Sequence, residues 1–292
     1  MASSHPIEIL PAGDTVGEGI LWDSRRHVLW WTDIQRSRLY RHDWKSRTTQ
    51  VLDTPERVGS FGLVAGSARL ITAFESGIAL YDPDTRQVSW LARPEAEILG
   101  VRFNDGRVDR RGRFWCGTMV EDRSRAVRGN LYCVDSGRAR CEVGGIAISN
   151  SLCMSPDGSQ LYFADSPTRT INVYRVIEPH GSLESPRIFA RTPEGSVPDG
   201  ATVDAEGCVW SAQWGGARVV RYTPDGRIDR TLEVPTTQPS CVCFGGPDLD
   251  LLFVTSAREN LPAAVLEREP HAGDVFVYRT GLKGLPEPEY RT

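Results

Sequence analysis

The 292-residue sequence lacks a long apolar run, and none of its hydrophobic stretches approaches the roughly 20 residues that a membrane helix requires. Its first residues, MASSHPIEIL, do not resemble a signal peptide, so we expect a cytoplasmic protein with no membrane contact. The sequence also lacks any run of lysine or arginine, and its formal net charge is -4. This charge gives no reason to expect nucleic acid as a partner.

Common catalytic and redox motifs are absent as well. The sequence has no G-x-S-x-G, no H-E-x-x-H, no P-loop and no Rossmann fingerprint, and its five histidines are isolated from one another. Its seven cysteines are an odd number, and none forms a C-x-x-C pair. Most lie in apolar, strand-like runs, which favours reduced thiols over disulfides or a zinc cluster.

What the chain does contain is a repeat. Short segments rich in β-branched and aromatic residues recur roughly every 40 to 48 residues, the period of a propeller blade of four strands. They are VLWWTD (28–33), RLITAF (69–74), RFWCGT (113–118), QLYFAD (160–165), CVWSAQ (208–213) and LLFVTS (251–256). Turn signatures precede most of them, and alternating strands follow. We therefore expect an all-β fold: a single six-bladed β-propeller domain over residues 1–292, with four-stranded antiparallel blades around a central channel.

The tripeptide Pro-Asp-Gly, a typical turn sequence, occurs three times, with its aspartate at Asp157, Asp199 and Asp225. Asp157 falls in the hairpin turn of its repeat, in the same slot as the turn that begins at Asp204. Asp225 joins two later strands. Asp199 comes a whole strand earlier, where the innermost strand of its blade begins, so we interpret it as a functional residue rather than a turn residue.

The same slot holds polar residues in most of the other repeats. It contains Glu18, Ser60, Asn104, Asn150 and Cys241 in the remaining five units. Innermost strands surround the channel of a propeller, so equivalent positions converge on one end of its axis. The sequence thus predicts two carboxylates and two carboxamides at one mouth of the channel.

This set of side chains indicates a cation. Burying Glu18 close to Asp199 would cost several kcal/mol of repulsion and desolvation unless a cation compensates. Carboxylate and amide oxygens suit Ca²⁺, Mg²⁺ or Mn²⁺ and are acceptable to Zn²⁺. With about three protein ligands, such a metal would keep positions open for water and substrate. The alternative is that these residues cap turns at strand entries.

Further residues are expected around the same mouth, because the aromatic strands run antiparallel to the innermost ones. Arg102 lies two residues before Asn104, on the same strand face. A rim of arginine, carboxylates and tryptophan suits a small polyhydroxylated ligand, although each residue could equally be a surface residue or a blade-to-blade partner. The expected rim residues are Asp33, Glu75, Met119, Val120, Glu121, Asp165, Ser166, Trp214 and Arg258.

Five motifs along nearly the whole chain resemble the regucalcin (senescence marker protein) and gluconolactonase family of six-bladed propellers. They are GEGILWD (17–23), RFNDGRVDRRGRFWCGTM (102–119), ISNSLCMSPDGSQLYFADS (148–166), PDGATVDAEGCVWSAQWGG (198–216) and CFGGPDLDLLFVTSAR (243–258). This chain departs from the family in having Ile20 where a proline is frequent, and Ser151 where a glycine commonly follows the metal-binding asparagine.

The resemblance implies one divalent metal at the top of the channel, which could be Ca²⁺, Zn²⁺, Mn²⁺, Mg²⁺ or Fe(II). By the same resemblance, its ligands are Glu18, Asn150 and Asp199, and the substrate-binding residues are Arg102, Asn104 and Glu121.

The implied reaction is hydrolysis of a sugar lactone to its aldonic acid, with Asp199 as general base. Two alternatives remain: a calcium-dependent esterase or phosphotriesterase, and a non-catalytic calcium-binding propeller. We expect a monomer or weak homo-oligomer.

Overall fold

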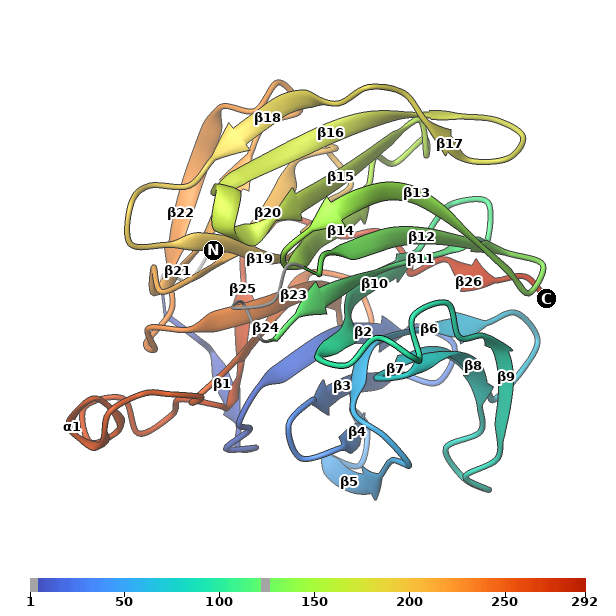
Figure 1. The fold of residues 1–292 in the computed structure, drawn as a ribbon. Helices are drawn as coiled ribbons and strands as arrows, with labels where there is room; N and C mark the ends of the chain where they lie inside the picture. The colour runs from blue at the N-terminus through green and yellow to red at the C-terminus, as the bar shows by residue number, and fades with distance from the viewer. Residues whose placement is uncertain (1–4, 122–126) are drawn as a thin grey trace.

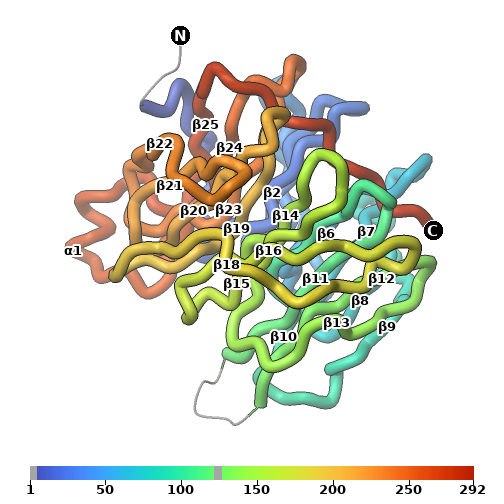
Figure 2. Tube along the Cα trace, turned by 90° about the horizontal axis from the view of Figure 1, so that it is seen from above, coloured from blue at the N-terminus to red at the C-terminus, as the bar shows by residue number. Residues whose placement is uncertain are grey.

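The structure is a computed structural model, in which we describe residues 5–121 and 127–292. Six small antiparallel sheets form a ring (Figure 1), which confirms the predicted six-bladed β-propeller. Seen from above (Figure 2), β2, β14, β19 and β23 lie near the centre, and β9 and β22 lie toward the periphery. No helix among the described residues is long and apolar enough to cross a membrane.

Blades 1 to 5 run in chain order from the innermost strand outward, and blade 6 does so except for its outermost strand. Blade 1 comprises β2 (Gly17–Asp23), β3 (Val28–Asp33), β4 (Arg38–Asp43) and β5 (Thr48–Asp53), and blade 2 comprises β6 (Val58–Val64), β7 (Leu70–Phe74), β8 (Gly77–Tyr81) and β9 (Val88–Ala92). Blade 3 comprises β10 (Val101–Val108), β11 (Phe114–Val120), β12 (Gly129–Asp135) and β13 (Arg138–Ile146).

The second half of the ring follows the same plan. Blade 4 comprises β14 (Ser149–Met154), β15 (Gln160–Asp165), β16 (Thr170–Ile177), β17 (Ser182–Leu183) and β18 (Arg187–Arg191). Blade 5 comprises β19 (Val197–Val203), β20 (Val209–Trp214), β21 (Arg218–Tyr222) and β22 (Ile228–Glu233). Blade 6 comprises β23 (Pro239–Gly245), β24 (Leu251–Ser256), β25 (Val275–Arg279) and, outermost, β1 (Glu8–Leu10). Two short helices, η1 (Ser166–Thr168) and the protruding α1 (Ala263–Leu266), lie in connecting segments.

The blades differ from the predicted four strands in two places. In blade 4, β17 and β18 both pair with β16, so the outer edge is built from two pieces. In blade 2, β26 (Glu289–Tyr290) adds to the inner strand β6 in parallel. The ring itself is closed by β1, which pairs with β25 and so joins the beginning of the chain to the last blade.

Most of the core consists of six large apolar clusters, each shared by two neighbouring blades, and a seventh, small cluster contains Val16, Ile34 and Ala257. The aromatic strands contribute the largest buried side chains, including Trp30, Trp115 and Trp210. In two blades the turn aspartate holds the indole of the next strand: Asp109 accepts from Trp115 Nε1 at 2.9 Å, and Asp204 accepts from Trp210 Nε1 at 2.8 Å. In blades 3 and 5 the repeated turn therefore also fixes a tryptophan of the aromatic strand.

The three Pro-Asp-Gly tripeptides separate as predicted. Asp157 lies in a turn and accepts the backbone N–H of Ser159 at 3.0 Å, and Asp225 also lies in a turn. Asp199 instead lies inside β19. The cysteines also agree with the prediction, since all seven are free thiols and six of them are buried.

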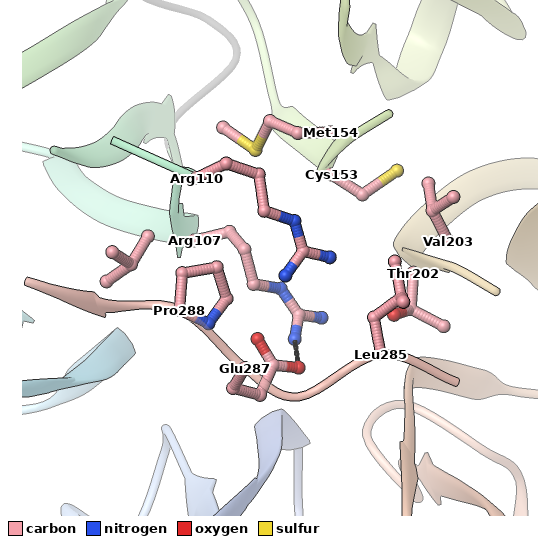
Figure 3. A pocket seen from close by; sticks show the side chains of 10 residues that line it. Arg107, Arg110, Cys153, Met154, Thr202, Val203, Leu285, Glu287 and Pro288 are labelled. Atoms are coloured by element: carbon pink, nitrogen blue, oxygen red, sulfur yellow. Dashed lines mark hydrogen bonds and ion pairs between the residues drawn. The ribbon is translucent and has the colours of Figure 1, made fainter. Parts of the chain in front are cut away.

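The far end of the channel is closed by the last residues of the chain. Arg107 Nη1 donates to Glu287 at 2.5 Å, and Arg110 Nη1 donates to the carbonyl of Pro286 at 2.9 Å. These side chains line a small cavity with Cys153 and Val203 (Figure 3). Its volume of about 20 Å³ is room for about one water molecule, so this cavity is too small for a sugar.

Candidate active site and metal centre

Backbone bulges present the polar residues of the predicted slot. In all six innermost strands, the pairing with the next strand shifts register at this slot. The shifts fall between Glu18 and Leu21 in β2, between Asn150 and Cys153 in β14, and between Pro198 and Ala201 in β19. A bulge bends a strand and redirects its side chains, which explains how regular strands converge on one point.

A cavity of about 280 Å³ opens at this mouth of the channel. Five of the six predicted site residues line it: Glu18, Arg102, Asn104, Asn150 and Asp199. All five are buried, with at most 7% of their surface exposed. The cavity also includes three expected rim residues, Met119, Ser166 and Trp214, and five that the sequence reasoning missed, Val16, Ile148, Val197, Glu259 and Asn260.

The two carboxylates of the set disfavour each other's charge. Burial, together with the charge of Asp105, raises the pKa of Glu18 to about 8, although the N–H of Gly19 donates to its Oε2 at 3.0 Å. Burial and then the neighbouring Glu18 raise the pKa of Asp199 well above its usual range. Two adjacent buried carboxylates require either bound protons or a cation. Their presence, with an amide oxygen nearby, fits a divalent metal.

The proposed metal site has few charged ligands. Among residues 5–121 and 127–292, no three His, Cys, Asp or Glu side chains converge in the manner of a metal site. The predicted set has two carboxylates, and its third donor is the amide of Asn150. Such a set fits the hard cations that accept amide oxygens and water, better than a four-ligand structural zinc.

A hydrogen-bonded line of amides crosses the cavity wall. Asn104 Nδ2 donates to Asn150 Oδ1 at 3.1 Å and to the carbonyl of Ser149 at 3.0 Å. Asn150 Nδ2 in turn donates to Ser166 Oγ at 2.8 Å. These contacts fix both amides, so that their orientation is defined before any ligand binds.

Arg102 connects this line to Glu121, the sixth predicted site residue. Its Nη1 donates to Asn104 Oδ1 at 2.8 Å, and its Nε donates to Glu121 Oε1 at 3.0 Å. Glu121 does not line the cavity directly but is held at its edge by Arg57. Arg57 donates to both oxygens of Glu121, at 2.7 and 3.0 Å. These hydrogen bonds are the main reason that the pKa of the Glu121 carboxyl is lowered.

Sequence reasoning missed Arg57 and Glu259. Arg57 immediately precedes β6 and also donates to both oxygens of Glu75, at 2.8 and 2.7 Å. Glu259 follows β24 and accepts from Gln35 Nε2 at 2.7 Å. Both lie in connecting segments outside the repeated slot, where the sequence carries no periodic signal.

Two expected rim residues have a structural role instead. Asp33 accepts the backbone N–H of Thr15 at 2.8 Å, and Asp165 accepts that of Ile148 at 2.9 Å. Each thereby fixes the segment that leads into the innermost strand of its own blade. These two contacts lie within a single blade, so neither the rim role nor a blade-to-blade role describes Asp33 and Asp165, whereas Glu18, Asn150 and Asp199 line the cavity.

Comparison with known proteins gives consistent matches over nearly the whole chain. Residues 16–258 match the family described as "SMP-30/Gluconolactonase/LRE-like region". The chain is 41% identical to a 6-deoxy-6-sulfogluconolactonase of Pseudomonas putida, over 94% of each chain. It is 39% identical to an L-arabinolactonase of Azospirillum brasilense, over 93% of this chain and 91% of that protein.

Solved structures agree with these matches. The crystal structure of a calcium-binding protein, regucalcin, from Agrobacterium tumefaciens superimposes with a TM-score of 0.93 at 30% identity. The superposition covers 100% of this chain and 98% of that one. A luciferin-regenerating enzyme superimposes with a TM-score of 0.89 at 27% identity, covering 98% and 99% of the two chains.

Proposed function

The chain belongs to the SMP-30/gluconolactonase/LRE-like family, and on this basis we propose that it hydrolyses a sugar lactone to the corresponding aldonic acid with the help of one divalent metal ion. The relatives named as lactonases support the reaction. The observation that carries the proposal for this chain is the buried pair of Glu18 and Asp199 in a cavity of about 280 Å³.

Glu18, Asn150 and Asp199 would hold the metal. When bound, a divalent ion supplies Lewis acidity that polarises the lactone carbonyl and stabilises the developing negative charge. All three donors are oxygens, so Ca²⁺, Mg²⁺, Mn²⁺, Zn²⁺ and Fe(II) are candidates, and the calcium-binding regucalcin favours Ca²⁺.

Asp199 serves as the general base in this proposal. Its carboxylate removes a proton from the water whose oxygen attacks the carbonyl carbon, and the ring C–O bond then breaks. The ring oxygen leaves as a hydroxyl group after taking up a proton, which gives the open-chain aldonic acid. Arg102 and Asn104 orient the sugar hydroxyls, because both are buried in the cavity wall: Arg102 is a guanidinium donor, and Asn104 Oδ1, which Arg102 Nη1 holds in place, is an acceptor. Glu121, held by two arginines at the cavity edge, accepts a hydrogen bond from a sugar hydroxyl.

The proposal is tested by acid release from a panel of aldonolactones, with an enzyme-free control because lactones also hydrolyse spontaneously. We expect turnover that EDTA abolishes and that one of the candidate metals restores. Asp199→Ala should abolish turnover with the fold intact. If Asp199→Ala retains full lactonase activity, its assignment as base and ligand is wrong.

The same experiment separates the other candidate functions. Metal binding without turnover of any lactone would identify a calcium-binding propeller, the function that the name of the calcium-binding regucalcin favours. Turnover of simple esters or phosphotriesters in place of lactones would identify the related esterase class.

A further inference from the structure

Two serine hydroxyls connect the strands that carry Asn150 and Asp199. Ser166, at the start of η1, donates from Oγ to the carbonyl of Pro198 at 2.7 Å. Ser151, in β14, donates from Oγ to the carbonyl of Asp199 at 2.6 Å. Both serines are buried, and both bonds cross from blade 4 to blade 5.

The Ser166 hydroxyl also determines how the Asn150 amide is turned. A serine hydroxyl has one proton, and a carbonyl can only accept, so the Ser166 proton is committed to Pro198. Ser166 Oγ can therefore only accept from Asn150, at 2.8 Å, which requires Nδ2 on that side. Oδ1, the atom that can bind a cation, is then turned away from Ser166.

Ser151 occupies an unusual backbone position. Its φ is 60°, in the left-handed region that favours glycine. The pairing of β14 with β15 skips Ser151, and the pairing of β19 with β20 skips Asp199. The bulges thus take the Asp199 backbone out of the regular ladder, and the Ser151 hydroxyl provides a donor for its buried carbonyl.

We propose that Ser151 and Ser166 form an inter-blade clamp that positions the metal ligands Asn150 and Asp199, and that this clamp raises the affinity of the protein for its divalent ion. The inference rests on the proposed metal site but goes beyond it, because neither serine is itself a ligand. Residues that orient metal ligands typically change metal affinity by about 10- to 100-fold when they are replaced.

The test is the Kd of Ca²⁺ and Mn²⁺ for the apoprotein, measured by isothermal titration calorimetry. Ser166→Ala and Ser151→Gly should each raise the Kd by about 10- to 100-fold. Ser149→Ala is the matched control: this serine precedes Asn150 in the same strand and is buried, but its Oγ has no hydrogen-bond partner among the described residues. Its Kd should stay within about twofold of wild type.

Ser151→Gly distinguishes a positioning role from a merely structural one. Glycine adopts the positive φ without strain, which offsets part of the cost of losing the bond to the Asp199 carbonyl, so the Tm of this variant in chelator should fall by no more than a few degrees. Weaker metal binding by an apoprotein that still melts cooperatively near the wild-type Tm supports the clamp. If both serine variants bind metal as tightly as wild type, the clamp is refuted while the metal site stands. If wild type binds no divalent ion, the metal site and the clamp both fail.

Discussion

Replacing Glu18 by glutamine should stabilise the apoprotein while it abolishes metal binding. The folded state holds Glu18 in a buried site, where its pKa is raised from the ordinary value of 4.5 to about 8. An unfolded chain returns this carboxyl to water and to its ordinary pKa. Folded protein therefore binds more protons than unfolded protein between pH 4.5 and 8, so stability falls as the pH rises through this window.

The size of the effect follows from the same values. At pH 7, about 2.5 pH units above the ordinary pKa, the raised pKa of Glu18 costs up to ~3 kcal/mol, at 1.36 kcal/mol per pH unit. A neutral glutamine of nearly the same shape removes this cost and still accepts the N–H of Gly19. The apoprotein should then melt up to ~6 °C higher, given about 2 °C per kcal/mol for a domain of this size.

The assay is calorimetry in EDTA at pH 5 and pH 8. Glu18→Gln should have the higher Tm at pH 8, and the two proteins should converge at pH 5, where the folded wild type is protonated at this site. Ca²⁺ should raise the Tm of wild type and leave that of the variant unchanged. Glu121→Gln is the control with the opposite sign, because Arg57 and Arg102 lower the pKa of Glu121 and its loss removes a favourable pair. A variant Tm at or below wild type in EDTA at pH 8 would refute the reasoning.

Two further predictions concern one residue beside the proposed active site and one residue of a structural turn. Arg57→Met removes the two hydrogen bonds from Arg57 to Glu121, so the KM for the lactone should rise about tenfold in steady-state kinetics while the metal Kd is unchanged. Asp157→Ala removes the turn contacts to Ser155 and Ser159, so the Tm should fall by a few degrees and kcat/KM should stay at the wild-type value. A rise in metal Kd for the first variant, or a loss of turnover for the second, contradicts these assignments.

Repetition explains which parts of the structure are visible in the sequence. Glu18, Asn150 and Asp199 stand in one slot of a six-fold repeat, so an alignment of the repeats brings them together without any knowledge of the fold. Arg57 and Glu259 reach the same mouth from connecting segments, which have no period to align. The position of a loop side chain depends on contacts distant in sequence, such as the bond from Gln35 to Glu259.

The sequence did not predict the addition of β26 to blade 2, for a similar reason. The pairing of β26 with β6 involves two residues far apart in sequence from their partners, and neither its length nor its parallel direction leaves a local pattern. The set of expected rim residues also combined two different roles. Asp33 and Asp165 lie at the ends of aromatic strands, where residues that face a ligand would also lie, but their carboxylates accept backbone N–H groups. Only the direction of each side chain separates these roles.

The placement of the proposed ligands on separate blades has a mechanical consequence. Glu18 belongs to blade 1, Asn150 to blade 4 and Asp199 to blade 5, so an ion held by all three would connect both halves of the ring. Hydrogen bonds already join blade 3 to blade 4 through Asn104, and blade 4 to blade 5 through Ser151 and Ser166. Blade 1 contributes its carboxylate from across the channel, where repulsion from Asp199 opposes close approach. Metal binding would replace that repulsion with a shared attraction, so an ion in the proposed site would also draw blade 1 toward blades 4 and 5.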